Sequence, residues 1–300
     1  MANGAIASWS ASWRESWKAI RPSREQDQCP HARRYWQNLR GRRHAVLLDR
    51  RRVCVEECLE TALIRALERS NSPARHVPSH RIPLGLILLS RHQVTQNQLL
   101  AALEAQRAGG RGRIGDWLQS MGAVTEQQVT AALARQWSCP VLRSDLPLPS
   151  ECLGRTVPLA LLQGAVMVPL TYIESASTLH VAFGEGIDYT VLYAIEQMMG
   201  IRTEPCMATP SFVHSRLEHL ARRREDTEFV FDRISDVAEF ARIVRSYSVR
   251  TSASEVRLAH CGSFHWVRLL QPSRPSMDLL MRFPQPPLPA FSGFSFPSLG

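Results

Sequence analysis

Residues 83–106, PLGLILLSRHQVTQNQLLAALEAQ, and residues 113–136, RIGDWLQSMGAVTEQQVTAALARQ, are two versions of one pattern. The offset between matching positions is constant at 30 residues, as the pairs Gly85 and Gly115 and Gln106 and Gln136 show. A constant offset over a whole segment is the signature of a duplicated structural unit. The sequence therefore predicts two tandem repeats of the same small fold.

Each repeat is predicted to form two short helices. In the first repeat, Leu84 and Leu88 lie one helical turn apart, and Leu99 and Leu103 repeat that spacing. Apolar residues spaced in this way are typical of helices with one buried face. The second repeat has apolar residues at all four matching positions, namely Ile114, Leu118, Val129 and Leu133.

Local signals fix where these helices begin and end. Thr95 and Gln98 match the S/T-x-x-E/Q capping box that starts a helix, and the same pair recurs 30 residues later. Gly122 follows the first helix of the second repeat, where a left-handed residue ends a helix at low cost. His92 stands at the matching position of the first repeat, so we expect that helix either to contain a strained residue or to end differently.

The pattern changes beyond Pro158 to alternating strands and helices. We expect strands in AVMVPLTYIE (165–174), TLHVAF (178–183) and TEPCMAT (203–209) and helices in PLALLQ (158–163), TVLYAIEQMMG (190–200) and PSFVHSRLEHLARR (210–223). Gly184 and Gly186 in FGEGIDY are interpreted as a tight strand-to-helix turn, because a lone G-x-G lacks the rest of a dinucleotide-binding motif.

The chain is predicted to be an α+β protein with four regions. Residues 1–78 form a basic segment that contains Trp and Cys, and residues 79–223 form one domain, made of the repeats followed by an α/β part at 145–223. Residues 224–283 are a short α+β piece, and residues 284–300, rich in Pro, Ser and Phe, are predicted to be a disordered tail.

Composition excludes several functions. The chain contains one lysine, Lys18, so the P-loop pattern G-x-x-x-x-G-K-[ST] is absent. The motifs G-x-S-x-G and H-E-x-x-H are absent as well, and no closely spaced carboxylate pair stands out. The sequence therefore favours a protein that is not an enzyme and does not bind ATP.

The repeats resemble those of the N-terminal domain of the type II secretion and type IV pilus assembly ATPases, the E-protein family. The family pattern is R-L-G-x-x-L-x-x-x-G-x-x-x-x-x-x-L-x-x-x-L-x-x-Q, and the resemblance extends from about Arg81 to Leu220. The second repeat matches it with Arg113, Ile114, Gly115, Leu118, Gly122, Val129, Leu133 and Gln136. The first repeat matches it with Leu84, Gly85, Leu88, Leu99, Leu103 and Gln106.

Some members of this family bind cyclic di-GMP with two tandem repeats, so the resemblance implies that these fourteen residues form a cyclic di-GMP site. Arginine can stack on guanine or pair with phosphate, and two similar repeats suit a ligand with two identical halves. The first repeat has Pro83 in place of the arginine, and Arg81 lies two residues upstream. The alternative is that both repeats are only a packed helical scaffold.

A fainter resemblance covers FARIVRSYSVRTSASEVRLAHCGSFHWVRL (240–269), which is similar to the start of the next domain of the same ATPases. The ATPase domain that follows in the family is not present. We therefore expect a regulatory or adaptor protein of a secretion or pilus machine, with protein components of that machine as partners. No apolar run is long enough to span a membrane, so we expect a cytoplasmic protein, held at the inner membrane only through partners.

Two other functions remain open. Cys54 and Cys58, together with Cys29 and His31, are candidate ligands of a degenerate zinc site, and residues 1–80 hold 15 Lys or Arg against 8 Asp or Glu. The chain would then be a zinc-containing nucleic-acid-binding protein, which we do not favour. In the third alternative the chain only holds protein partners, through residues 158–223 and a stripe formed by Trp9, Trp13 and Trp17.

Overall fold

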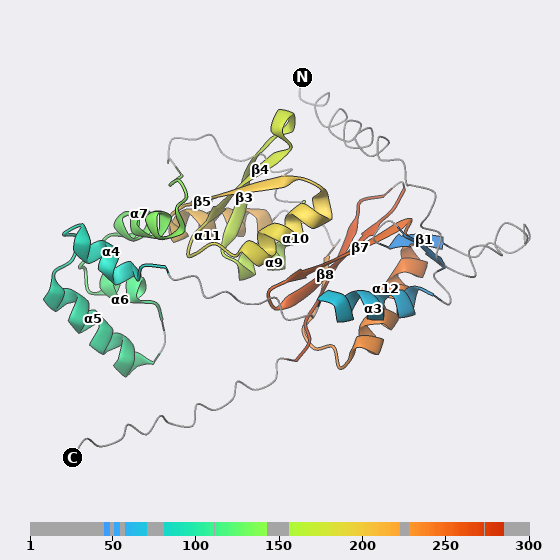
Figure 1. Cartoon of the computed structure of the whole chain (residues 1–300), viewed down its shortest axis with the longest axis horizontal. Coiled ribbons are helices and arrows are strands. Elements are labelled where there is room, and N and C mark those ends of the chain that lie inside the picture. The colour runs from blue at the N-terminus through green and yellow to red at the C-terminus, as the bar shows by residue number, and fades with distance from the viewer. Residues whose placement is uncertain are drawn as a thin grey trace, which may run out of the picture. The chain divides into compact units, whose positions relative to one another are not determined.

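The computed structural model describes residues 45–48, 51–54, 58–70, 81–110, 112–142, 156–222, 228–272 and 274–284. Its mixture of helices and two sheets confirms the predicted α+β class (Figure 1). The chain divides into two compact units. The first comprises Met1–Arg69, Val237–Leu258 and Leu269–Ser276, and the second comprises Ser70–Asp236, Ala259–Arg268 and Met277–Gly300.

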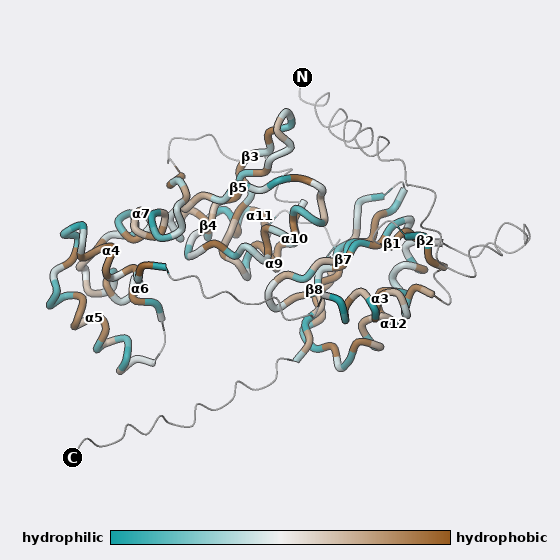
Figure 2. Tube along the Cα trace, in the orientation of Figure 1, coloured by the Kyte–Doolittle hydropathy of each residue, from teal (hydrophilic) through white to brown (hydrophobic). Residues whose placement is uncertain are grey.

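The repeats form four helices of the second unit, two for each repeat as predicted. They are α4 (Leu84–Ser90), α5 (Gln96–Gly109), α6 (Ile114–Ser120) and α7 (Glu126–Trp137). Both capping boxes are present: the backbone N–H of Gln98 donates to Thr95 Oγ1, and that of Gln128 donates to Thr125 Oγ1. Hydrophobic and hydrophilic residues alternate along these helices, as expected where one face is buried (Figure 2).

Left-handed residues end the first helix of both repeats. Gly122 has φ of 68° and His92 has φ of 56°, so the backbone turns in the same way in both repeats although only the second has a glycine there. The left-handed conformation brings the Cβ of a non-glycine residue close to the following carbonyl oxygen. The strain expected at His92 is therefore present.

The α/β part contains a three-stranded sheet in the order β3-β4-β5. Strands β3 (Met167–Ile173) and β4 (Thr178–Phe183) pair antiparallel, and β4 pairs in parallel with β5 (Arg202–Met207). A 3-10 turn, η1 (Glu174–Ala176), joins the first two strands. The helices are α9 (Leu159–Gly164), α10 (Tyr189–Met199) and α11 (Pro210–Ala221).

The repeats are attached to this sheet by hydrogen bonds. Val141 forms a parallel bridge to Met207, and the N–H of Leu142 donates to the carbonyl oxygen of Met207 at 2.7 Å. The hydroxyl and backbone N–H of Ser211, at the start of α11, both donate to Glu126 Oε1 at 2.7 Å. These contacts couple α7 to the α/β part.

The second sheet has six strands in the order β2-β1-β7-β8-β9-β6. They are β1 (Ala45–Leu48), β2 (Arg51–Cys54), β6 (Glu228–Phe231), β7 (Glu255–Cys261), β8 (Phe264–Leu270) and β9 (Met277–Met281). Helices α3 (Leu59–Ser70) and α12 (Val237–Thr251) are joined by an ion pair of 3.0 Å between Arg245 Nη1 and Glu60 Oε1.

The sequence places residues 45–69 with the N-terminal segment, whereas the structure pairs them with the C-terminal part of the chain. Leu47 lies opposite Glu255 and Leu48 opposite Val256, so β1 runs parallel to β7. Val46 and Leu48 of β1 are buried, and α3 buries Leu59, Leu63 and Leu67 at 0% exposure.

Candidate functional site

The two repeats pack on each other reciprocally. The first helix of each repeat lies against the second helix of the other, so α4 contacts α7 and α5 contacts α6. Gln106 Nε2 donates to the carbonyl oxygen of Gly112 at 2.9 Å, and Gln136 Nε2 donates to that of Ile82 at 2.7 Å. The two donors are 30 positions apart in the sequence, and so are the two acceptors. The repeats therefore pack with approximate two-fold symmetry.

The first glycine of each repeat allows close packing within the repeat. A Cβ atom at Gly85 would lie 2.7 Å from Leu99 Cδ1, and one at Gly115 would lie 3.1 Å from Val129 Cγ1. Leu99 and Val129 are themselves matching positions. These two glycines thus have a packing role in the scaffold, since a Cβ atom at either position would require the facing Leu99 or Val129 side chain to shift.

The apolar positions of the pattern form the core of the repeat region. Leu88 and Leu118 are fully buried, Leu99 and Val129 are also buried, and the flanking residues Leu84, Leu103, Ile114 and Leu133 pack against this cluster. These side chains stabilise the fold, and because they are buried or packed against the core, few of them are available to contact a ligand. The polar contacts of a bound ligand must therefore come from other positions.

Arg113 is the polar residue of the pattern that stays accessible. It precedes α6, where its backbone N–H donates to Asp116 Oδ2 at 3.1 Å. Its guanidinium forms an ion pair with Glu185, with 3.0 Å between Nη2 and Oε2 and side-chain exposures of 62% and 40%. An exposed pair of this kind is worth about 0–1 kcal/mol, so the guanidinium is held loosely.

The first repeat replaces this arginine with Pro83, but a guanidinium still lies near the start of α4. The Arg81 guanidinium carbon is 3.2 Å from the centroid of the Trp137 ring. Gln136, the neighbour of Trp137, holds the carbonyl oxygen of Ile82, the neighbour of Arg81. Arg81 is therefore fixed by a residue of the second repeat.

Arg113 contacts the loop that joins β4 to α10 directly, and Arg81 is linked to the same loop through Trp137. Glu185 in this loop pairs with Arg113, and a Cβ atom on the next residue, Gly186, would lie 3.2 Å from the Trp137 ring. Tyr189, at the start of α10, is 6.0 Å from Trp137 between ring centroids. The loop thus gathers two cations, one carboxylate and two aromatic rings from three parts of the second unit.

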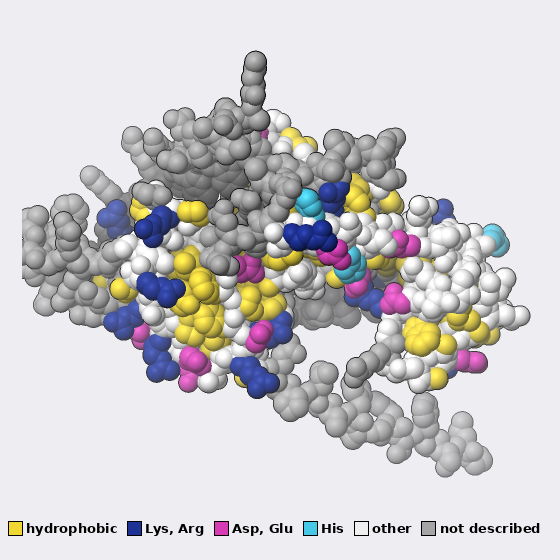
Figure 3. Space-filling view, turned by 180° about the vertical axis from the view of Figure 1, so that it is seen from behind, with side chains coloured by type: hydrophobic (Ala, Val, Ile, Leu, Met, Phe, Trp, Pro, Cys, Tyr) yellow, Lys and Arg dark blue, Asp and Glu magenta, His cyan; other side chains and the backbone are white. Residues whose placement is uncertain are grey.

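Apolar side chains are also exposed on the repeats. Ile82, Leu86, Leu100 and Met121 are 46–63% exposed. Figure 3 shows hydrophobic side chains within a mainly uncharged surface over this region. Leucine and isoleucine at the surface offer apolar contact to a ligand or a protein without adding charge.

The predicted zinc ligands are only partly described by the structure. Cys54 is buried at the end of β2, and the N–H of Cys58 donates to the carbonyl oxygen of Cys54. Cys29, His31, the tryptophan stripe and residues 285–300 lie outside the described residues. Among the residues that are described, no three His, Cys, Asp or Glu side chains gather at a point where they could hold a metal ion.

Burial suppresses the reactivity of other titratable groups in the second unit. Burial raises the pKa of the Cys206 and Cys261 thiols to about 12, so both stay protonated at neutral pH. Burial, together with the neighbouring His260, lowers the pKa of His265 to about 4. His265 is therefore neutral at pH 7.

No protein-family model matches the chain. The type IV pilus assembly ATPase PilB of Thermus thermophilus is 26% identical to it over 140 residues. This similarity fits an N-terminal domain of the GspE/PilB family. The matched residues make up 45% of the chain but only 15% of PilB, so the chain spans about one seventh of this relative's length.

Two solved structures are similar over the same share of the chain. A structure of MshE with cdg covers 47% of the chain and 99% of that structure, at 25% identity and a TM-score of 0.41. A structure of the N-terminal domain of XpsE covers 45% and 91%, at 18% identity and a TM-score of 0.36. Among the described residues, no helix is both long and apolar enough to cross a membrane.

Proposed function

We propose that the chain is a non-catalytic regulatory or adaptor protein of type II secretion or type IV pilus-type machinery, and that its tandem repeats bind cyclic di-GMP. The observation that carries this proposal is that Arg113 pairs with Glu185 in the loop between β4 and α10, while Arg81 lies over Trp137, which packs against Gly186 of the same loop. Each arginine comes from the start of the first helix of its repeat. The repeats thus offer one guanidinium for each half of a symmetric ligand.

Cyclic di-GMP fits the chemistry of these groups. It carries two guanine bases and two phosphates, and guanidinium groups can stack on a base or donate two hydrogen bonds to a phosphate. Arg113 is released at little cost, because its exposed pair with Glu185 is worth about 0–1 kcal/mol. The Arg81 guanidinium already lies over the Trp137 ring, so a guanine could add to this contact.

The buried residues of the repeats support the binding role indirectly. The buried leucines pack α4 and α6 into one core. The hydrogen bonds of Gln106 and Gln136 fix the backbone just before each of these helices. The backbone segments that carry Arg81 and Arg113 are thereby held in place before any ligand arrives, and such preorganisation of the backbone lowers the entropic cost of binding.

The non-catalytic part of the proposal rests on the sequence and on the thiols. The chain lacks a P-loop, its single lysine is Lys18, and the buried thiols of Cys206 and Cys261 are protonated. A regulator of this type would act by binding other proteins of the machine. We propose these components as its partners and the cytoplasmic side of the inner membrane as its place of action.

Calorimetric titration of cyclic di-GMP into the full chain tests the proposal. We expect saturable binding that weakens about tenfold or more in Arg113→Ala, since a lost charge-assisted contact is worth about 1.5–3 kcal/mol. The control is Arg91→Ala, which removes the same charge after the opposite end of α4. No binding to the unaltered chain, or equal loss in both variants, would reject a specific site.

A further inference from the structure

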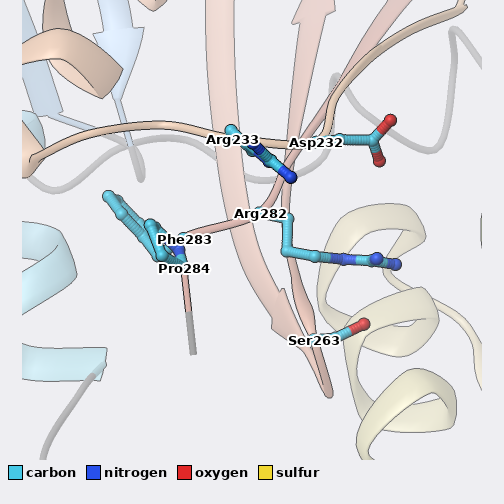
Figure 4. A pocket seen from close by; sticks show the side chains of 6 residues that line it. All are labelled: Asp232, Arg233, Ser263, Arg282, Phe283 and Pro284. Carbon is cyan, nitrogen blue, oxygen red and sulfur yellow. The ribbon is translucent and has the colours of Figure 1, made fainter. Parts of the chain in front are cut away.

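A cavity of about 420 Å³ lies at one end of the strands β6 and β9, in the second unit. Six residues line it (Figure 4), and they come from three segments: Asp232 and Arg233 after β6, Ser263 in the β7–β8 turn, and Arg282, Phe283 and Pro284 after β9. Strands β6 and β9 are parallel, so their carboxyl ends meet at the same edge. None of these residues belongs to the site at the repeats.

The backbone of the cavity wall is fixed by hydrogen bonds. The N–H of Arg282 donates to the carbonyl oxygen of Phe231 at 2.9 Å, and its own carbonyl oxygen accepts from the N–H of Ile234 at 3.0 Å. Arg282 is therefore tied to both sides of the Asp232–Arg233 segment. The position from which its side chain enters the cavity is set by the sheet.

The guanidinium of Arg282 is held by an aromatic ring and leaves its donors available. Its central carbon lies 4.2 Å from the centroid of the Phe264 ring. Its Nε is buried without a hydrogen-bond partner. Within the described part of the chain, no carboxylate forms an ion pair with Arg282 or with Arg233, although Asp232 lines the same cavity. By contrast, Arg268 is fully paired with Asp278.

We propose that this cavity binds a small phosphorylated compound, with Arg233, Arg282 and Ser263 holding its phosphoryl group. Guanidinium groups match the oxygens of a phosphate, and the serine hydroxyl adds a third donor. Donors from three segments suit a tetrahedral group with several acceptor oxygens better than a planar carboxylate with two. Phe283 and Pro284 form an apolar wall, and a volume of 420 Å³ leaves room for an organic part.

The test is calorimetric titration of inorganic phosphate and of phenyl phosphate into the full chain at low ionic strength, where charge contacts are least screened. We expect saturable binding of both probes, tighter for phenyl phosphate because of the apolar wall. Arg233→Gln and Arg282→Gln should each weaken binding about tenfold or more. Arg274→Gln, which removes an exposed charge that does not line the cavity, should leave binding unchanged.

Two control measurements distinguish loss of this site from other effects. Arg113→Ala should leave phosphate binding unchanged, which separates this cavity from the site at the repeats. Arg282 is half-buried, so circular dichroism must show a native spectrum for Arg282→Gln, while Arg233 is exposed and its variant should fold normally. No saturable binding of either probe at millimolar concentration, or equal affinity in Arg233→Gln and the unaltered chain, would overturn the proposal.

Discussion

The first and second repeats share much of their interior and differ at the ends of their helices. The matching pairs Leu88 and Leu118, and Ala102 and Ala132, are all at 0% exposure. Three of the differences lie at helix ends, where Pro83 stands for Arg113, His92 for Gly122 and Arg107 for Trp137. The scaffold thus keeps its two-fold relation while the groups available to a ligand have become unequal.

The largest expected effect concerns the shared interior. Leu88→Ala and Leu118→Ala should each lower the free energy of unfolding by about 2–5 kcal/mol, because both side chains are fully buried and leave cavities. Urea unfolding followed by circular dichroism measures both. Leu100→Ala, at a position 50% exposed, is the control and should change little. A large loss in one repeat only would show that the two cores are not equivalent.

The helix ends should respond in opposite directions. Gly122→Ala should cost about 1–2 kcal/mol of stability, because the backbone is left-handed there although space for a Cβ is free. His92→Gly should instead raise stability, by up to about 1 kcal/mol, because it removes the same strain. Thermal unfolding of the two variants compares them directly. If His92→Gly destabilises, the imidazole makes a contact that outweighs the strain.

The reciprocal hydrogen bonds should contribute equally. Gln106→Ala and Gln136→Ala each remove one amide donor from a backbone carbonyl and should each cost about 0.5–1.5 kcal/mol. Hydrogen exchange of α4 and α6 would locate the loosening at the start of the partner helix. Gln119→Ala, which removes a bond within one helix, serves as the comparison. Loosening confined to the helix that carries the substitution would contradict reciprocal packing.

The smallest effect is expected at Glu185. Glu185→Gln removes the carboxylate that pairs with Arg113, so it should change stability by less than about 1 kcal/mol. The freed Arg113 should bind cyclic di-GMP about two- to fivefold more tightly. Glu174→Gln, in the exposed turn η1, removes one negative charge elsewhere and should not alter affinity. Weaker binding in Glu185→Gln would mean that the carboxylate contacts the ligand.

The sequence predicted the elements whose signals are local. Both capping boxes, the left-handed Gly122 and the three strands of the α/β part follow from short patterns and are confirmed. Trp137 was missed as part of the candidate site, because it lies one residue beyond the pattern and its matching residue is Arg107. Only the packing of α7 against the start of α4 brings it to Arg81.

Contacts between distant residues could not be predicted. The pairing of β1 with β7 joins segments about 200 residues apart, and β6, the four residues EFVF, is too short to give a period. The buried group of Arg268, Trp266 and Asp278 was also missed. Arg268 Nε and Trp266 Nε1 both donate to Asp278 Oδ1 at 2.7 Å. The alternation of apolar and polar residues along a strand does not show which carboxylate a buried arginine will pair with.

The most direct test is calorimetric titration of cyclic di-GMP into the full chain and into Arg81→Ala, Arg113→Ala and the double variant. If the repeats form two halves of one platform, one ligand binds per chain and each single substitution lowers affinity about tenfold or more. The double substitution should then cost less than the sum of the single losses, because the two residues act on one ligand. Binding that survives Arg81→Ala unchanged would contradict the two-half platform.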